Sequence, residues 1–292
     1  MRNGKRIPKG LVLSLPAILT VFSVSTFPLL FSFVMSFYDM NVVARRTTFV
    51  GLGNYVTIFS DPEFLRSFGL TAYYAAFTLG AALMLGLGYA LLLNERFLGR
   101  RIVMTLTIVP WSIPMVVTGA MWRWILHPEY GALDGLLNQL GLISGHINYF
   151  PVGGLGCLTT VATVQVWRDT PLACILFLAA LQAVPKELFD ASEVDGANTF
   201  QRFRLITLPW LRPAFLVVVI LLTVNAFIQY DLIYMLTQGG PGFDTTIMSW
   251  QIYTVSFRKF QYTVGMAFAW ILAAITFVLS YVYVRSLYGK LE

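Results

Sequence analysis

The sequence of 292 residues is poor in charge, in cysteine and in histidine. Only 12% of its residues are charged, about half the fraction usual in a soluble domain, whereas 57% are hydrophobic. The two cysteines, Cys157 and Cys174, fall in or beside one apolar segment, so they do not form a disulfide framework. The two histidines, His127 and His146, share one loop, where we expect solvated residues rather than metal ligands. This composition is typical of a membrane protein.

The sequence also lacks a Gly-x-x-x-x-Gly-Lys-Ser/Thr segment, the loop that binds nucleotide phosphates. If ATP drives this protein, another chain must therefore bind it. An intramembrane enzyme would need a nucleophile with its base or a set of metal ligands, and neither is present. We therefore expect no catalytic residue, no metal and no cofactor in this chain.

Six apolar segments are long enough to cross a bilayer, which takes about 20 residues. They are Leu11–Phe37, Leu70–Leu93, Ile102–Leu126, Gly154–Ala183, Pro213–Leu236 and Val264–Tyr283. The first follows a basic start, but it is too long for a signal peptide and has no small-residue cleavage site. The sequence predicts an all-α membrane protein with six transmembrane helices in a single domain, residues 1–292.

The basic residues follow the loops between these segments. Lys and Arg together number 20, against 14 Asp and Glu, an excess that could suggest nucleic acid. With the N-terminus inside, the outer loops hold only Arg45, Arg46, Arg66, Arg258 and Lys259, and the cytoplasmic segments hold most of the others. Positive charge concentrates on the cytoplasmic side of membrane proteins. We therefore expect both termini in the cytoplasm and no nucleic-acid partner.

The longest compact polar interval, residues 185–213, lies between the fourth and fifth predicted spans. An apolar face recurs every three residues along its first half, at Leu188, Ala191 and Val194. Gly196 allows the left-handed conformation that ends helices. Asn198 and Gln201 then have the spacing of a capping box. The pattern predicts a short helix, a glycine corner and a second short helix, which carries Phe200, Phe203 and Ile206 inward and ends at Pro209.

This interval resembles the EAA loop of binding-protein-dependent ABC importer permeases. The family pattern is Glu-Ala-Ala, three residues, Gly, and after nine more residues Ile-x-Leu-Pro. Here Asp190-Ala191-Ser192, Gly196 and Ile206-Thr207-Leu208-Pro209 fill these positions, with Asp and Ser as conservative departures. In the family the loop docks on a cytoplasmic ATPase. The resemblance assigns that docking role to Asp190, Ala191, Glu193, Asp195, Gly196 and Ala197.

Three further segments resemble sugar-type members of the same family. Gly51-Leu52-x-Asn54-Tyr55, Asp61-Pro62-x-Phe64 and Leu236-Thr237-x-Gly239-Gly240-Pro241 match the GL-x-NY, D-P-x-F and LT-x-GGP elements. The resemblance implies the type I ABC importer permease fold in a bacterial inner membrane. It also implies three kinds of partner: a second permease of similar fold, two copies of an ATP-binding subunit and an extracytoplasmic solute-binding protein.

Polar residues inside the fourth and fifth spans form the candidate substrate site. Arg168 and Asp169 lie within the fourth span, where charge is costly and usually faces water or the bundle interior. Asn225, Gln229 and Leu232 follow one helical stripe of the fifth span, and Tyr230 adds an aromatic face. Sugars offer hydroxyl edges and an apolar face, which such residues can bind. The resemblance adds that Arg168, Asp169 and Asn225 match substrate-contact positions in maltose-type permeases.

Several alternatives remain open at this stage. Arg168 and Asp169 could neutralise each other while the amides join helices, which would make a structural cluster. Pro110 and Pro114 are expected to break the third span, and this break could be a gate or a static kink. Small residues such as Ala82 and Gly86 allow close helix packing. A self-sufficient secondary transporter is the alternative function, although the sequence shows no repeated halves. Whether the solute is a neutral or an anionic sugar stays undecided.

Overall fold

The computed structural model describes residues 9–41 and 45–288 of the chain. The fold divides into two compact units. The first contains the residues up to Pro62 together with Ile252–Ile271, and the second contains Glu63–Gln251 together with Leu272 onward. The predicted cytoplasmic ends, residues 1–8 and 289–292, lie outside the described residues.

The first unit begins with the first predicted span, which is helical throughout and contains a π-helical turn. Its elements are α1 (Lys9–Val21), η1 (Phe22–Thr26), α2 (Phe27–Met35), β1 (Tyr38–Asn41), β2 (Arg46–Phe49), α3 (Gly53–Ser60) and η3 (Thr254–Arg258). The two strands are antiparallel, with Tyr38 opposite Phe49 and their rings 5.3 Å apart. The expectation of an all-α chain is therefore wrong at this hairpin. Aromatic and β-branched side chains, which favour strands, supply the cross-strand contacts.

The GL-x-NY segment has a structural role within this unit. The Asn54 side-chain amide donates hydrogen bonds of 2.8 Å to the carbonyls of Ser36 and Tyr38. The hydroxyls of Tyr55 and Ser36 lie 2.7 Å apart and are hydrogen-bonded. These bonds join helix α3 to the end of α2, where helix carbonyls lack intrahelical partners, and to the start of β1.

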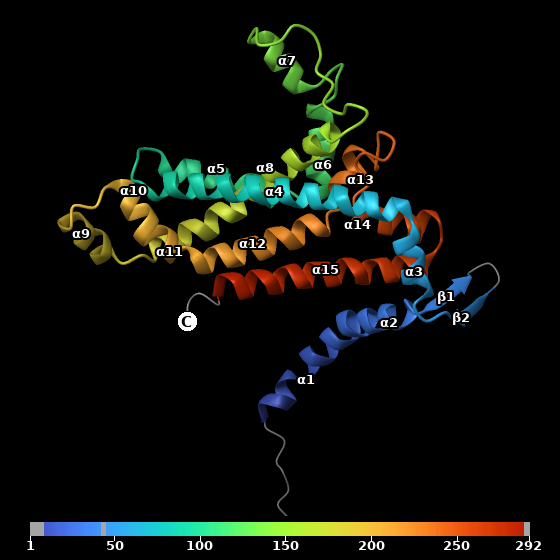
Figure 1. Cartoon of the computed structure of the whole chain (residues 1–292). Helices are drawn as coiled ribbons and strands as arrows, with labels where there is room; N and C mark the ends of the chain where they lie inside the picture. The colour runs from blue at the N-terminus through green and yellow to red at the C-terminus, as the bar shows by residue number, and fades with distance from the viewer. Residues whose placement is uncertain (1–8, 42–44, 289–292) are drawn as a thin grey trace, which may run out of the picture. The chain divides into compact units, whose positions relative to one another are not determined.

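The second unit contains the long helices α4 (Pro62–Asn94), α5 (Arg100–Ser112), α8 (Gly156–Gln182) and α12 (Arg212–Phe227), which run side by side (Figure 1). Shorter helices complete it: α6 (Met115–Ile125), α7 (Ala132–Gln139), α9 (Lys186–Val194), α10 (Thr199–Arg202), η2 (Phe203–Thr207), α11 (Leu208–Trp210), α13 (Asp231–Leu236) and α14 (Met248–Tyr253). Helix α14 and the last helix, α15 (Tyr262–Tyr288), contribute residues to both units.

Within residues 9–41 and 45–288, four helices are each long and apolar enough to cross a membrane, and two bent helix pairs raise the total to six if each pair is one span. The pair α5 and α6 bends by 100°, which confirms the break predicted from Pro110 and Pro114. The pair that ends in α12 bends by 63°. Pro209 does not end a helix as predicted, because it lies inside α11 and the chain bends after Trp210.

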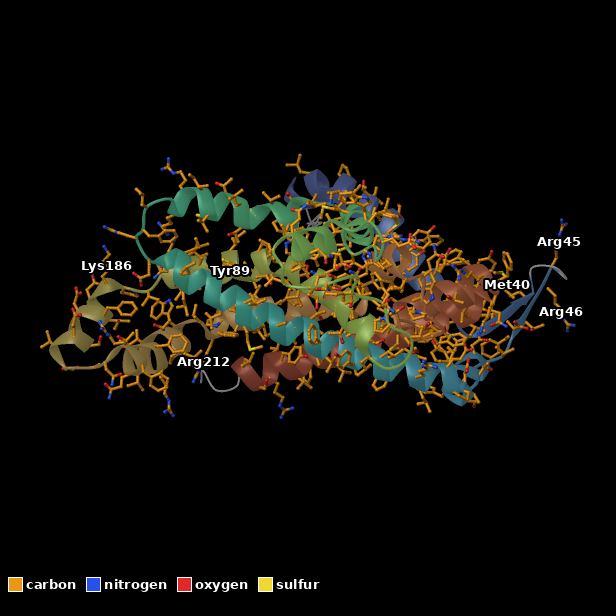
Figure 2. The ribbon with its side chains drawn as sticks, turned by 90° about the horizontal axis from the view of Figure 1, so that it is seen from above. Met40, Arg45, Arg46, Tyr89, Lys186 and Arg212 are labelled. Atoms are coloured by element: carbon orange, nitrogen blue, oxygen red, sulfur yellow. The ribbon has the colours of Figure 1, made fainter. Side chains whose placement is uncertain are left out.

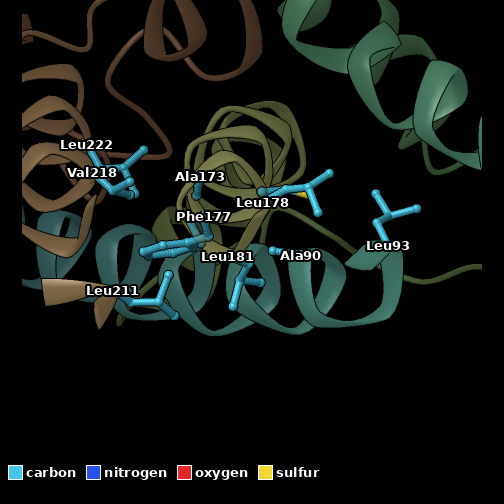
Figure 3. Close-up of a cluster of buried hydrophobic side chains, with 11 residues drawn as sticks. Ala90, Leu93, Ala173, Phe177, Leu178, Leu181, Leu211, Val218 and Leu222 are labelled. Atoms are coloured by element: carbon cyan, nitrogen blue, oxygen red, sulfur yellow. The ribbon is translucent and has the colours of Figure 1, made fainter. Parts of the chain in front are cut away.

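The core of the second unit lies where α4, α8 and α12 meet. Figure 3 shows Phe177 and Leu181 of α8 directed toward Ala90 of α4 and toward Leu211, which precedes α12. Gly86 brings the backbones of α4 and α8 together, since a Cβ atom there would lie 2.5 Å from that of Ala173. In a bilayer, such close packing is a main source of helix association.

Candidate functional site

A hydrogen-bonded network occupies the middle of α8. The Asp169 carboxylate accepts a bond of 3.0 Å from the Arg168 guanidinium and one of 3.1 Å from the Gln165 amide. The Gln165 side-chain oxygen in turn accepts from the Tyr74 hydroxyl of α4. Asp169, Gln165 and Tyr74 are buried, and Arg168 is partly exposed. The predicted Arg168–Asp169 pair is therefore present, within a larger network than the sequence indicated.

The fifth predicted span is broken at the residues that were assigned to the substrate. Helix α12 ends at Phe227 and α13 begins at Asp231, so Gln229 and Tyr230 lie between two helices. The prediction of one continuous helical stripe through Asn225, Gln229 and Leu232 is therefore wrong. The Ser249 hydroxyl donates to the backbone carbonyl of Gln229, which satisfies a group that the break sets free.

The structure brings some of the predicted residues together and separates others. The Gln229 side chain is buried beside the break, but its amide nitrogen has no hydrogen-bond partner. Asn225 is half-buried on the last turn of α12. The Tyr230 ring instead stacks on Trp250, at 5.7 Å, and on Tyr234, at 5.6 Å. The packing of the Tyr230 ring therefore stabilises the break, and the ring is not part of the hydrogen-bonded network.

Sequence reasoning missed Gln165 and Tyr74. Gln165 lies one helical turn before Asp169, a spacing at which side chains of a helix meet, so the sequence held a usable signal for it. Tyr74 comes from a different helix, and no local pattern links it to α8.

The third span contributes a second contact with α8. Trp122 of α6 lies edge-on to Trp167 of α8, with ring centroids 5.4 Å apart. Gly119 of α6 lies against α13, because a Cβ atom there would be 2.6 Å from that of Met235. The two broken spans are thus packed against each other.

The predicted docking loop folds largely as expected. Helix α9 is followed by Gly196 with a φ of +74°, and Asn198 and Gln201 form the reciprocal bonds of a capping box at the start of α10. The Arg202 guanidinium lies 3.2 Å from the Glu193 carboxylate and joins the two helices. Residues 185–213 therefore hold their shape through bonds of their own.

Apolar side chains of this loop face outward. Val194 is 90% exposed, Phe200 is 70% exposed and Leu188 is 41% exposed. The expectation that Phe200 points inward is wrong, because helix α10 is too short to lay that face on the chain's own core. Asp190, Ala191, Glu193, Asp195 and Gly196 are exposed as well, and Ala197 is half-buried.

The loop between α6 and α8, which the sequence left without structure, is organised by Asp134 of α7. Its carboxylate accepts bonds of 2.5 Å from the Tyr149 hydroxyl and 2.9 Å from the Ile147 amide. These two bonds hold the pKa of Asp134 below its usual value, with a smaller contribution from His146 at 3.6 Å. Burial and the neighbouring carboxylate raise the pKa of Tyr149 to about 12.

The LT-x-GGP segment forms a tight loop after α13. The Thr245 hydroxyl donates a bond of 2.8 Å to the Gly240 carbonyl and lies 2.7 Å from the Thr237 hydroxyl. Gly239 has a φ of +88° and abuts the Trp250 indole, so only glycine fits there. Asp244 accepts from Arg66 at 3.0 Å and from the Gly153 amide at 2.6 Å, which connects this loop to α4 and to the start of α8.

Comparisons with known proteins agree with this architecture. Residues 79–291 match the family described as binding-protein-dependent transport system inner membrane component. The chain is 33% identical over 274 residues to the trehalose/maltose transport system permease protein MalF of Thermococcus litoralis, which covers 92% of this chain and 89% of the relative. It is 32% identical over 290 residues to the sulfoquinovosyl glycerol transport system permease protein SmoG of Agrobacterium fabrum, a match that covers 98% of this chain and 92% of the relative.

A solved structure has the same fold. It is a bacterial ABC transporter involved in the import of the acidic polysaccharide alginate, and it aligns with a TM-score of 0.79 at 21% identity over 94% of this chain and 93% of that one. A second structure, of the alginate transporter with an alginate pentasaccharide-bound periplasmic protein, aligns with a TM-score of 0.78 at 20% identity over 96% of both chains. The present chain is a membrane transport subunit rather than an enzyme, and it belongs to the family of inner membrane components of binding-protein-dependent ABC transport systems.

Proposed function

We propose that this permease moves a sugar or a sugar derivative through the membrane, driven by ATP hydrolysis on partner subunits. The observation that carries the proposal is the network of Tyr74, Gln165, Arg168 and Asp169 beside the break at Gln229. Discontinuous helices in transporters usually mark the solute site. The named relatives transport trehalose or maltose and sulfoquinovosyl glycerol, and all of these solutes are carbohydrates.

The depth of the network supports a transport site. The fourth span enters from outside at the start of α8, and at about 1.5 Å per residue Asp169 lies roughly 20 Å along that helix. Asn225 lies on the last turn of α12, just before the break in the fifth span. Asp169 is therefore near the bilayer midplane, where transporters hold their solutes.

We further propose six spans with both termini in the cytoplasm. Within the second unit, Figure 2 shows Lys186 and Arg212 at the end where the docking loop lies. Basic residues collect at the cytoplasmic ends of spans, so this end faces the cytoplasm. Each bent helix pair then serves as one span.

The loop at residues 185–213 is the proposed docking site of an ATPase subunit. Its exposed Leu188, Val194 and Phe200 form an apolar surface on a preformed pair of helices, which suits a groove on a protein partner. The acidic Asp190, Glu193 and Asp195 surround that surface. ATP is bound by this partner and not by the permease.

The complete transporter in this proposal has a second permease of similar fold, two copies of the ATP-binding subunit and an extracytoplasmic solute-binding protein. Six spans provide one wall of the pathway, and the second permease provides the other. The lipid bilayer surrounds both, and no nucleic acid takes part.

Substitution of the two amide residues at the break, next to the network, tests the proposal. In the reconstituted transporter, Asn225→Ala and Gln229→Ala should each lower sugar uptake and sugar-stimulated ATPase activity while the complex stays assembled. Gln182→Ala, at the exposed end of α8, is the matched control and should leave both rates unchanged. If both site variants transport at the wild-type rate, the solute is not bound at this network. A parallel loss of assembly and of thermal stability would identify the residues as structural.

A further inference from the structure

Helix α14 begins with four consecutive buried residues that contact two different parts of the second unit. Met248, Ser249, Trp250 and Gln251 are each at most 8% exposed. The first and the last of them bind α4, and the two in the middle bind the break of the fifth span. Figure 1 shows α14 beside α4 and α13, the helix that follows the break. We call these four residues the bracket.

Two hydrogen bonds attach the bracket to α4. The backbone N–H of Met248 donates a bond of 2.8 Å to the Thr71 hydroxyl, and the Gln251 amide donates one of 2.9 Å to the Glu63 carboxylate. The Thr71 hydroxyl itself donates to the Ser67 carbonyl, so its direction is fixed. The first N–H groups of a helix have no partner inside the helix, and α4 supplies one for Met248. Helix α4 thus holds the bracket at both ends.

The two middle residues of the bracket hold the break. The Ser249 hydroxyl donates to the backbone carbonyl of Gln229, which the break sets free. The Trp250 ring stacks on the Tyr230 ring, with centroids 5.7 Å apart and 17° between the ring planes. Gly239 abuts the same indole, where no side chain would fit. The backbone at the break is therefore held by α14 and, through α14, by α4.

The side chain on this backbone has an unused hydrogen-bond donor. Gln229 is 4% exposed, and among the residues that the structure describes its amide nitrogen has no hydrogen-bond partner. Native proteins pair nearly all their buried polar groups, so an exception inside a proposed solute site indicates a ligand. A donor whose backbone is held rigid by other residues can bind the oxygen of a sugar hydroxyl without first being ordered.

We infer that Ser249 is a positioning residue for the solute: its bond to the Gln229 carbonyl holds the free amide of Gln229 where a sugar hydroxyl binds it. The inference rests on the proposed function and adds to its site an element that lies outside the fourth and fifth spans. Ser249 acts through Gln229 and does not touch the solute, and Thr71 supports the bracket from α4.

Loss of this bond should lower the affinity for sugar. Without the Ser249 hydroxyl the Gln229 carbonyl is buried and unpaired, and the break must shift to find it another donor. The amide donor moves with the backbone and no longer meets the sugar. A merely structural role, in contrast, would reduce the amount of assembled complex and leave the sugar affinity of the assembled fraction unchanged.

Equilibrium binding of radiolabelled sugar to the purified permease–ATPase complex tests the inference. The extracytoplasmic binding protein is left out, because it binds sugar itself. Maltose, trehalose and sulfoquinovosyl glycerol, the solutes named for the relatives, are the probes. Ser249→Ala should raise the Kd about two- to tenfold, the effect of one hydrogen bond. Ser249→Thr keeps the hydroxyl and should retain the wild-type Kd.

A second pair of variants and a matched control accompany these. Thr71→Val removes the acceptor of the Met248 N–H at nearly constant volume and should also raise the Kd, whereas Thr71→Ser keeps the acceptor and should not. Ser286→Ala is the control, because the Ser286 hydroxyl is exposed and donates only to the Tyr283 carbonyl of its own helix. It should leave the Kd unchanged.

A double variant decides whether Ser249 acts through Gln229. Effects of residues that work through one another do not add, so Ser249→Ala combined with Gln229→Ala should bind sugar as Gln229→Ala alone does. Multiplied effects in the double variant would overturn the inference, and so would an unchanged Kd in both Ser249→Ala and Thr71→Val while Gln229→Ala binds weakly. Either result would leave the proposed function intact. An unchanged Kd in Gln229→Ala, or binding of none of the three sugars by the wild-type complex, would refute the proposed solute site and the inference together.

Discussion

Gly86 gives the sharpest test of how the helices around the proposed transport site are held together. In the Gly86→Ala variant the new Cβ atom would lie 2.5 Å from the Cβ of Ala173 and 3.1 Å from the backbone nitrogen of Cys174. Carbon atoms pack at about 3.5–4.0 Å, so α4 and α8 must separate by roughly 1 Å. Neither contacted atom belongs to a flexible side-chain end, and local rotation cannot relieve the clash.

The expected loss of stability follows from the core that surrounds this contact. Phe177 and Leu181 of α8 pack beside it with Ala90 of α4, and all of them are buried. Overpacking of a well-packed core costs typically about 1–3 kcal/mol, which is about a five- to hundredfold shift in the folding equilibrium. The network of Asp169 lies about one turn away on α8, so transport should fall with stability.

Two glycines of the same helix provide matched controls. No atom lies within 4 Å of a Cβ built at Gly80 or at Gly88. Gly80→Ala and Gly88→Ala should therefore be neutral or slightly stabilising, because alanine favours a helix over glycine by up to about 1 kcal/mol. Thermal unfolding of the purified variants in detergent separates the cases. If Gly86→Ala unfolds at the same temperature as Gly88→Ala, the close approach of α4 and α8 does not exist as described.

Two further predictions concern the loops on either side of the spans. Gly196→Val should uncouple transport from ATP hydrolysis and leave the chain inserted, since a φ of +74° strains a β-branched residue by about 1 kcal/mol or more. Asparagine tolerates this conformation better, so Gly196→Asn should retain coupling when ATPase activity and uptake are measured together. Equal coupling in both variants would contradict the role of this corner. Hydrogen exchange of the loop around Asp134 should show constant protection at neutral pH. Asp134, whose pKa is lowered from 3.8, stabilises the folded loop fully above pH 3.8, and this stabilisation is lost as the pH falls through the lowered pKa. Tyr149 stabilises the folded loop fully below pH 10.0, and this stabilisation is lost as the pH rises through about 12. Tyr149→Phe should open the loop at a higher pH on the acid side, and an unchanged acid limit would show that the pair does not control the loop.

The sequence predicted those features that depend on local patterns. Gly196 and the spacing of Asn198 and Gln201 predicted the helix, corner and capped helix of the docking loop, and the structure has all three. Pro110 and Pro114 predicted the break of the third span, because proline removes a helix donor and clashes with the preceding turn. The predicted limits of the fourth span differ from the observed helix by two residues at its start and one at its end.

The break in the fifth span could not be predicted in this way. Residues 224–232 contain neither Gly nor Pro, and their periodicity favours one continuous helix. The break is stabilised from elsewhere in the chain, since Ser249 satisfies the freed carbonyl of Gln229 and Trp250 stacks on Tyr230. Local propensity is overridden by tertiary packing here. The partnership of Tyr74 with Gln165 is hidden from the sequence for the same reason.

The bonds that close the docking loop affect how the transporter assembles. The reciprocal bonds of Asn198 and Gln201, together with the Arg202–Glu193 pair, fix both short helices before any partner arrives. The conformational entropy of ordering this segment, about 1–2 kcal/mol for each residue's backbone, is then lost during folding of the permease rather than at the moment of association. A rigid surface of this kind binds without the ordering cost of a disordered one. In the proposed transporter, the affinity between permease and ATPase is therefore set in part by Asn198, Gln201 and Arg202, which are not among the residues assigned to docking.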